Sequence, residues 1–163
     1  MNKRYPRFWG ATILSLVVAL ILMLLPLPEW LTPWRPEWAA LTIMHWGFVL
    51  SNRGGFLAAW ITGLCVDTLF DSMLGLHAMG YTLMLFVTLY ASTRMNERNL
   101  VQQTLLITFA LASYLLFKLW ISGVTGNPNH DYVQYWTPLL SSLIIWPFYN
   151  AFLNLFHVKK KTL

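Results

Sequence analysis

The chain has 163 residues, of which 57% are hydrophobic and only 10% are charged. Because a soluble domain normally carries about a quarter charged residues, this composition excludes an ordinary soluble globular protein. The formal charge of +5 does not indicate nucleic-acid binding, since the basic residues form short clusters between long apolar runs, as they do in membrane proteins. The length suggests a single domain over residues 1–163.

The first apolar run, residues 8–25, follows Lys3, Arg4 and Arg7 and precedes Pro26. It is longer than the core of a secretory signal peptide, about 7–15 residues, and no small-residue cleavage motif follows it. We therefore predict an uncleaved first transmembrane helix that ends at the proline.

Tryptophans mixed with charged residues occupy the next stretch, a composition typical of the membrane–water interface. Pro36 suits the first turn of the helix that follows. The remaining apolar runs predict five more helices, two of them short for a membrane span. The six predicted helices cover residues 8–25, 38–50, 56–70, 73–93, 100–122 and 136–157.

Polar residues separate these helices. Residues 51–55 predict a tight turn because they include two glycines, and Asp71 and Ser72 predict a second turn that caps the following helix. His130 and Asp131 fall in a polar loop before the last helix, and Pro147 is expected to kink that helix.

The basic residues predict the orientation. The chain has 11 lysines and arginines. If it crosses the membrane six times from a cytoplasmic N-terminus, only Arg35 lies outside and only Lys118 lies within a span. The others, including Arg53, then lie inside, so the positive-inside rule predicts that both termini are cytoplasmic. An alternative is a re-entrant hairpin of the two short helices, which would place Arg53 in or across the membrane at a high cost.

Four residues of the third predicted helix, Ala59, Gly63, Asp67 and Asp71, are spaced four apart and form one column along it. Small residues such as Ala59 and Gly63 permit close helix packing. The column is therefore expected to face protein, with Asp67 buried and Asp71 at the outer turn.

Other ionisable residues inside the spans are costly and therefore suggestive. Lys118 has two interpretations: it pairs with Asp67 or Asp71, or its ammonium extends to the outer headgroups. His77 and His45 are interpreted as helix-packing histidines, with a proton relay or a ligand contact as the alternative for His77.

The sequence contains no recognisable catalytic or metal motif. The only cysteine, Cys65, cannot form a disulfide within the chain and is expected to be a small buried hydrophobe. Nucleophile elbows, glycine-rich phosphate loops and zinc-binding histidine patterns are missing from the sequence. Two aspartates on one helix do not make a protease site when only Asp67 is clearly buried. We therefore predict no enzyme activity, no cofactor and no metal.

Residues 63–80, GLCVDTLFDSMLGLHAMG, resemble the signature of the rod shape-determining protein MreD family. The matching positions are Gly63, Asp67, Leu74 and Gly75. A second match is the RPEW segment, residues 35–38, after a stretch rich in proline and tryptophan. Asp71 departs from the family pattern, which usually has a small residue there.

The resemblance implies a non-catalytic inner-membrane component of the bacterial cell-wall elongation complex, required for rod shape and for regulation of peptidoglycan synthesis. The implied partners are an MreC-like bitopic protein, an MreB-like filament, RodZ, and a RodA-type glycosyltransferase with its class B penicillin-binding transpeptidase.

The family is also similar in fold to the substrate-binding subunits of energy-coupling-factor transporters. This likeness implies an all-α integral membrane protein of six transmembrane helices. It also supplies an alternative function, a small-molecule binding or transport subunit. The residues predicted to have structural or partner-interface roles are Ala59, Gly63, Asp67, Asp71, Gly75, His77, Lys118, Arg35 and Pro36.

Overall fold

The computed structural model describes residues 9–49, 52–92, 100–126 and 132–158, and its regular elements are all helical. They are α1 (Trp9–Leu24), the 3-10 helix η1 (Thr32–Trp34), α2 (Trp38–Val49), α3 (Asn52–Leu69), α4 (Leu76–Ser92), α5 (Leu100–Val124) and α6 (Tyr132–Val158). The predicted all-α class is confirmed for this part of the chain. The basic clusters at both termini, Arg94, Arg98, His130 and Asp131 lie outside the described residues, so the orientation stays a prediction.

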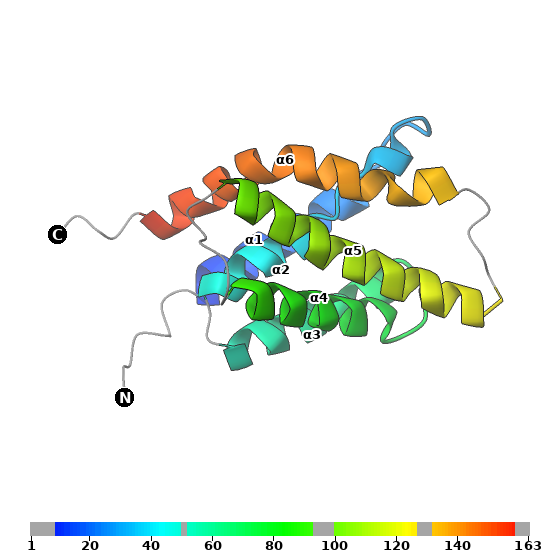
Figure 1. Cartoon of the computed structure of the whole chain (residues 1–163), viewed down its shortest axis with the longest axis horizontal. Coiled ribbons are helices and arrows are strands. Elements are labelled where there is room, and N and C mark those ends of the chain that lie inside the picture. The colour runs from blue at the N-terminus through cyan, green and yellow to red at the C-terminus, as the bar shows by residue number, and fades with distance from the viewer. Residues whose placement is uncertain (1–8, 50–51, 93–99, 127–131, 159–163) are drawn as a thin grey trace.

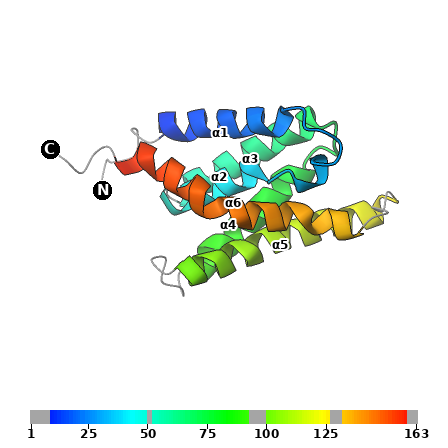
Figure 2. The same ribbon diagram turned by 90° about the horizontal axis from the view of Figure 1, so that it is seen from above.

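Successive α-helices run in alternating directions along the bundle (Figure 1). The start of α1 and the end of α6 therefore lie at the same end. The opposite end carries η1, the α3–α4 turn and the end of α5, and we call it the η1 end. Figure 2 shows α1 along one edge of the bundle and α5 along the other, with α2 between them.

Helix α2 is the centre of the bundle. Residues 39–47 are all buried, and α2 contacts α1, α3, α4 and α6. A helix that is apolar on every side is stable only when other helices surround it, which explains how so short a helix is held. Its polar groups are bonded to its neighbours: Trp46 Nε1 donates to Ser15 Oγ of α1 at 2.7 Å, and the hydroxyls of Thr42 and Tyr149 of α6 are 2.7 Å apart.

The predicted turn at residues 51–55 is wrong, because α3 already begins at Asn52. Gly54 and Gly55 are buried inside this helix. A Cβ added at Gly55 would lie 3.4 Å from Leu85 Cδ2 of α4 and 3.8 Å from Gly47 Cα of α2. Both distances are ordinary van der Waals contacts, so Gly55 lies at a helix-packing surface rather than in a turn, a role that the sequence alone does not distinguish.

The turn between α3 and α4 is longer than predicted, since α4 begins at Leu76 and not at residue 73. Two residues within it have positive φ, Asp71 at 50° and Gly75 at 98°. Aspartate tolerates the left-handed region better than most residues and glycine adopts it freely. The turn conformation thus accounts for Gly75, and it explains why a glycine would suit position 71 equally well.

Helix α6 also begins earlier than predicted, at Tyr132, and contains two prolines, Pro138 and Pro147. It bends along its length in both views (Figures 1 and 2). Proline removes a helical hydrogen bond and bends a helix, as was expected for Pro147. Pro36 lies just before α2 rather than in its first turn.

Large apolar side chains are exposed on the outer faces of the helices, among them Ile13 and Leu14 of α1 and Phe109 of α5. In the described residues one helical segment, Val101–Val124, is both long and apolar enough to cross a membrane, and the shorter apolar segments are Trp9–Leu24, Gly54–Leu69 and Leu76–Ser92. The expectation of a buried Cys65 is wrong, since this residue is exposed. An apolar run does not distinguish a face that contacts other helices from a face that contacts lipid.

The closest approach between α3 and α4 occurs at Gly63. This glycine is buried, and a Cβ added to it would overlap the backbone of Ala78 and lie 2.7 Å from the carbonyl carbon of His77. Ala59, one turn earlier, is completely buried. Gly63 therefore faces α4, and because both small residues are buried, their surface is not available to a partner's helix.

Replacing Gly63 by alanine should separate α3 from α4, because backbone atoms cannot move aside as a flexible side chain does. Overpacking of this kind costs about 1–3 kcal/mol or more, which a lower Tm in detergent would show. Gly10→Ala in α1 is the matched control, since no atom lies within 4 Å of the added Cβ. Equal stability of the two variants would contradict the close approach.

Candidate functional site

The carboxylate of Asp67 joins the end of α3 to the start of α4. Asp67 is buried with 1% of its surface exposed. Its Oδ2 accepts the backbone N–H of Gly75 at 2.8 Å, and its Oδ1 accepts the backbone N–H of His77 at 2.9 Å. The side chains of Ser72 and His77 also donate to Oδ1, at 2.8 and 2.7 Å. Both oxygens are therefore occupied by groups of the turn and of α4.

These bonds make Asp67 the cap of α4, although it belongs to the preceding helix. The first N–H groups of a helix lack intrahelical partners, and a negative charge near them is favourable. Asp71 was predicted to cap this helix, but it is exposed and its side chain contributes no described hydrogen bond to the start of α4. The distant Asp67 takes that role because the turn folds back over the end of α3.

His77 is held by the same carboxylate. The residue is 5% exposed, and its Nδ1 lies 2.7 Å from Asp67 Oδ1 and 3.3 Å from Ser72 Oγ. Because an ionised carboxylate only accepts hydrogen bonds, Nδ1 carries the proton in this contact. The ring also packs edge-on against Tyr81, with centroids 5.9 Å apart. The packing interpretation therefore describes this histidine, and the same ring also forms part of a cavity wall.

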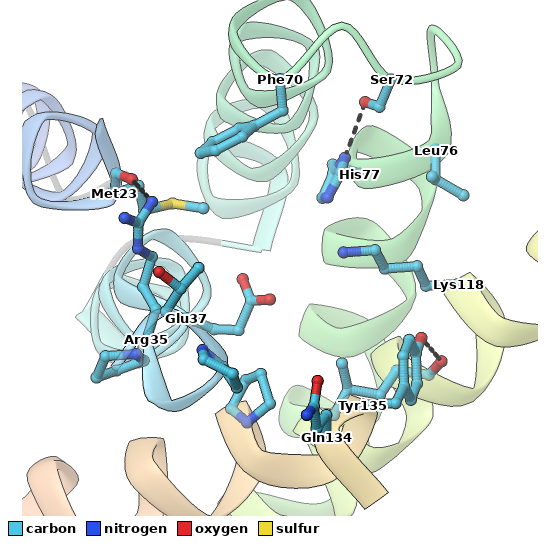
Figure 3. Close-up of a pocket in the computed structure, with 15 residues that line it drawn as sticks. Met23, Arg35, Glu37, Phe70, Ser72, Leu76, His77, Lys118, Gln134 and Tyr135 are labelled. Carbon is cyan, nitrogen blue, oxygen red and sulfur yellow. Dashed lines mark hydrogen bonds between the residues drawn. The ribbon is translucent and has the colours of Figure 1, made fainter. Parts of the chain in front are cut away.

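A cavity of about 590 Å³ opens beside this network at the η1 end. Its wall combines residues of α1, η1, the segment between η1 and α2, the α3–α4 turn, α4, α5 and α6. Figure 3 shows Glu37 on one side and Lys118 on the other, with both side chains directed into the space between them. The lining residues are Met23, Thr32, Pro33, Arg35, Pro36, Glu37, Phe70, Ser72, Leu76, His77, Leu115, Lys118, Gln134, Tyr135 and Pro138.

Arg35 lies on this wall but its guanidinium is engaged elsewhere. It donates to the carbonyl oxygens of Met23 and Leu25, the latter at 2.7 Å. Both carbonyls belong to the end of α1, where backbone oxygens lack helical partners and a positive charge is favourable. Arg35 therefore closes the C-terminus of α1, and this accounts for an arginine in so apolar a chain.

Glu37 is the residue of this site that the sequence analysis did not single out. Its backbone N–H donates to Ser142 Oγ of α6 at 3.0 Å, and its Oε1 accepts a long bond of 3.5 Å from the hydroxyl of Tyr114. Its Oε2 is buried and has no partner among the described residues. An acidic residue at the start of an apolar helix was the available signal, because ionisable groups at membrane depth are expensive.

Lys118 does not pair with either aspartate. Among the described residues the one ion pair joins His77 to Asp67, so the predicted pairing of Lys118 with Asp67 or Asp71 is not found. Its Nζ lies 6.0 Å from the centre of the Tyr114 ring. The ammonium faces the cavity (Figure 3) and not a fixed anionic partner.

His45 is a packing residue of the central helix α2. Its ring is 5% exposed, and its Nδ1 lies 2.8 Å from Asn150 Oδ1 of α6. It does not line the cavity. The structure thus brings together Arg35, Pro36, Lys118 and His77 around one space, with Asp67 behind His77.

Replacing Asp67 by asparagine should loosen the α3–α4 junction. The asparagine amide has one acceptor oxygen, whereas the carboxylate accepts hydrogen bonds at both of its oxygens. One N–H of the turn would therefore face the amide NH2, which is itself a donor. Loss of charge-assisted bonds and one unsatisfied donor cost about 2–4 kcal/mol, measurable as a lower Tm in detergent. Asp71→Asn is the matched control, because asparagine tolerates positive φ. A Tm equally unaffected in both variants would contradict the capping role.

The chain is similar to known proteins over almost its full length. A family model described as rod shape-determining protein MreD matches residues 6–158. The chain is also similar to a rod shape-determining protein MreD of Haemophilus influenzae, with 24% identity over 167 residues that cover 99% of this chain and 98% of the relative. No solved structure matches, so the likeness to transporter subunits stays a prediction. The match from before α1 to the end of α6 shows that this chain belongs to the MreD family.

Proposed function

We propose that this chain is a non-catalytic component of the bacterial cell-wall elongation complex that is required for rod shape. The observation that carries the proposal is the family match over residues 6–158, which includes all of the described helices. In this role the protein regulates peptidoglycan synthesis by assembling or biasing its partners, and it makes or breaks no bond itself.

The geometry of the ionisable residues supports a non-catalytic role. The buried carboxylate of Asp67 has both oxygens engaged in hydrogen bonds that hold two helices together. A general acid, general base or nucleophile needs access to a substrate atom, and this carboxylate is covered by the turn that it holds.

We further propose that the protein lies in the bacterial inner membrane as six spans with both termini in the cytoplasm. Alternating helix directions (Figure 1), exposed apolar side chains on the outer faces and the positive-inside pattern support this placement. The η1 end, with its cavity, then faces the periplasm, and the junction between α2 and α3 faces the cytoplasm.

A topology reporter fused after Gly55 tests this orientation. A phosphatase that is active only after export should be inactive there, whereas a cytoplasmic reporter at the same position should be active. The matched fusion after Gly126, at the end of α5, should give the reverse pattern. Phosphatase activity after Gly55 would instead favour the re-entrant hairpin.

The proposed partners are an MreC-like bitopic protein, an MreB-like filament, RodZ, and a RodA-type glycosyltransferase with its class B penicillin-binding transpeptidase. Helices associate in membranes by close packing. Because Gly63 is buried against α4 and Ala59 is buried within the bundle, we place the partner contacts on exposed apolar faces such as that of α1. This face carries Ile13, Leu14 and Val17.

Depletion of this protein in the bacterium that encodes it tests the proposed function. Rod cells should become round, and expression of the unchanged chain should restore their shape and retain an MreC-like protein on purification. Asp71→Asn should rescue fully, whereas Asp67→Asn should rescue poorly because its α3–α4 junction is weakened. Normal rods after verified depletion would contradict the proposal.

A further inference from the structure

Two charges of opposite sign face the same cavity without forming a pair. Glu37 Oε2 is buried and has no hydrogen-bond partner among the described residues, and Lys118 forms no ion pair with them. Of the other charged groups nearby, Arg35 donates to two carbonyls of α1 and keeps only a buried Nε without a partner among the described residues, and Asp67 binds the α3–α4 turn. One anion and one cation therefore remain available to a ligand.

The cost of this arrangement is the reason to look for a ligand. Buried charges are expensive unless they are paired or solvated, and Glu37 Oε2 is buried. In the structure Glu37 and Lys118 lie on opposite sides of a space of about 590 Å³ and both point into it (Figure 3). This volume lies within the range of small-molecule sites, about 300–1,000 Å³.

The charge pair selects the kind of ligand. A simple anion would contact Lys118 but be repelled by Glu37, and a simple cation would meet the reverse problem. A zwitterion satisfies both residues at once. Because Glu37 Oε2 lacks a donor, the cationic group should carry N–H bonds, as a primary ammonium does and a quaternary ammonium does not.

The surroundings of the cavity indicate the source of the zwitterion. Trp30, Trp34 and Trp120, at the same end of the bundle, are 75%, 47% and 65% exposed. Exposed tryptophans of this kind lie at the level of lipid headgroups. Phe70, Leu76 and Leu115 add apolar surface to the cavity wall, which suits the glycerol end of a lipid.

We propose that this cavity binds the headgroup of an aminophospholipid of the phosphatidylethanolamine type. Lys118 contacts the phosphate, and Glu37 accepts hydrogen bonds from the primary ammonium. Gln134 and Tyr135 lie on the adjacent wall. The site requires only that the bundle is in a membrane, so it stands or falls independently of the partners proposed above.

The test is a competition on the intact protein in detergent. Equimolar phosphatidylethanolamine and phosphatidylcholine are added, and native mass spectrometry measures the lipid that stays bound. These two headgroups have the same net charge but differ in ammonium N–H donors. A preference of about tenfold for phosphatidylethanolamine is expected, as for one charge-assisted hydrogen bond. Equal retention of the two lipids would overturn the proposal.

Variants assign the preference to the cavity. Glu37→Gln should abolish it, and Lys118→Gln should lower the retention of both lipids, because both carry the phosphate. Glu29→Gln, an exposed acid that does not line the cavity, should change neither the preference nor the retention. Helical circular dichroism verifies that each variant is folded, and the competition on the unchanged chain stands even where a variant does not fold. A preference that survives in folded Glu37→Gln, or unchanged retention of both lipids in folded Lys118→Gln, would contradict the assignment.

Two further probes separate the alternatives. Protection against thermal unfolding by free phosphoethanolamine as strong as that by the lipid would overturn the lipid source in favour of a soluble zwitterion. Stronger retention of phosphatidylglycerol, whose headgroup has no ammonium, would overturn the role of Glu37. Strong coupling between Glu37→Gln and Lys118→Gln in stability, without any lipid preference, would show that the two residues pair directly and that the cavity closes.

Discussion

The carboxylate of Asp67 is the interaction on which the η1 end of the bundle depends. It accepts the backbone N–H of Gly75, directly before α4, and that of His77 in the first turn of α4, while remaining part of α3. This bond set fixes the path of the turn and the orientation of the His77 ring. The backbone contact at Gly63, one turn earlier, needs the same alignment of the two helices. The α3–α4 hairpin therefore depends on the charged cap at Asp67 and on the absence of a side chain at Gly63.

The cavity is a consequence of how the helix ends at this side are closed. Arg35 donates to free carbonyls at the end of α1, and Asp67 accepts from free N–H groups at the start of α4. Each of these two helix termini therefore has its own counter-charge. Glu37 and Lys118 close no helix terminus in this way, and they lie on opposite sides of the cavity (Figure 3). The central α2 keeps this separation, because its surrounded faces are bonded to α1 and α6.

Much of this arrangement could be predicted from the sequence, and the failures share physical causes. The spacing of Ala59, Gly63 and Asp67 correctly indicated a buried face, because a four-residue period reports helix packing directly. Apolar runs do not reveal whether a side faces protein or lipid, which is why Cys65 was misplaced. A cap supplied by a residue eight or ten positions away leaves no local signature, so Asp71 was preferred. Glu37 was missed because its importance comes from a cavity that only the assembled helices create.

Hydrogen–deuterium exchange at the start of α4 tests the central claim most directly. In the unchanged protein the amides of Gly75 and His77 should exchange slowly, since both donate to Asp67. In Asp67→Asn these amides should exchange much faster under native conditions, while amides in the middle of α5 keep their protection. Equal protection of Gly75 and His77 in both proteins would show that the carboxylate does not hold the two helices together.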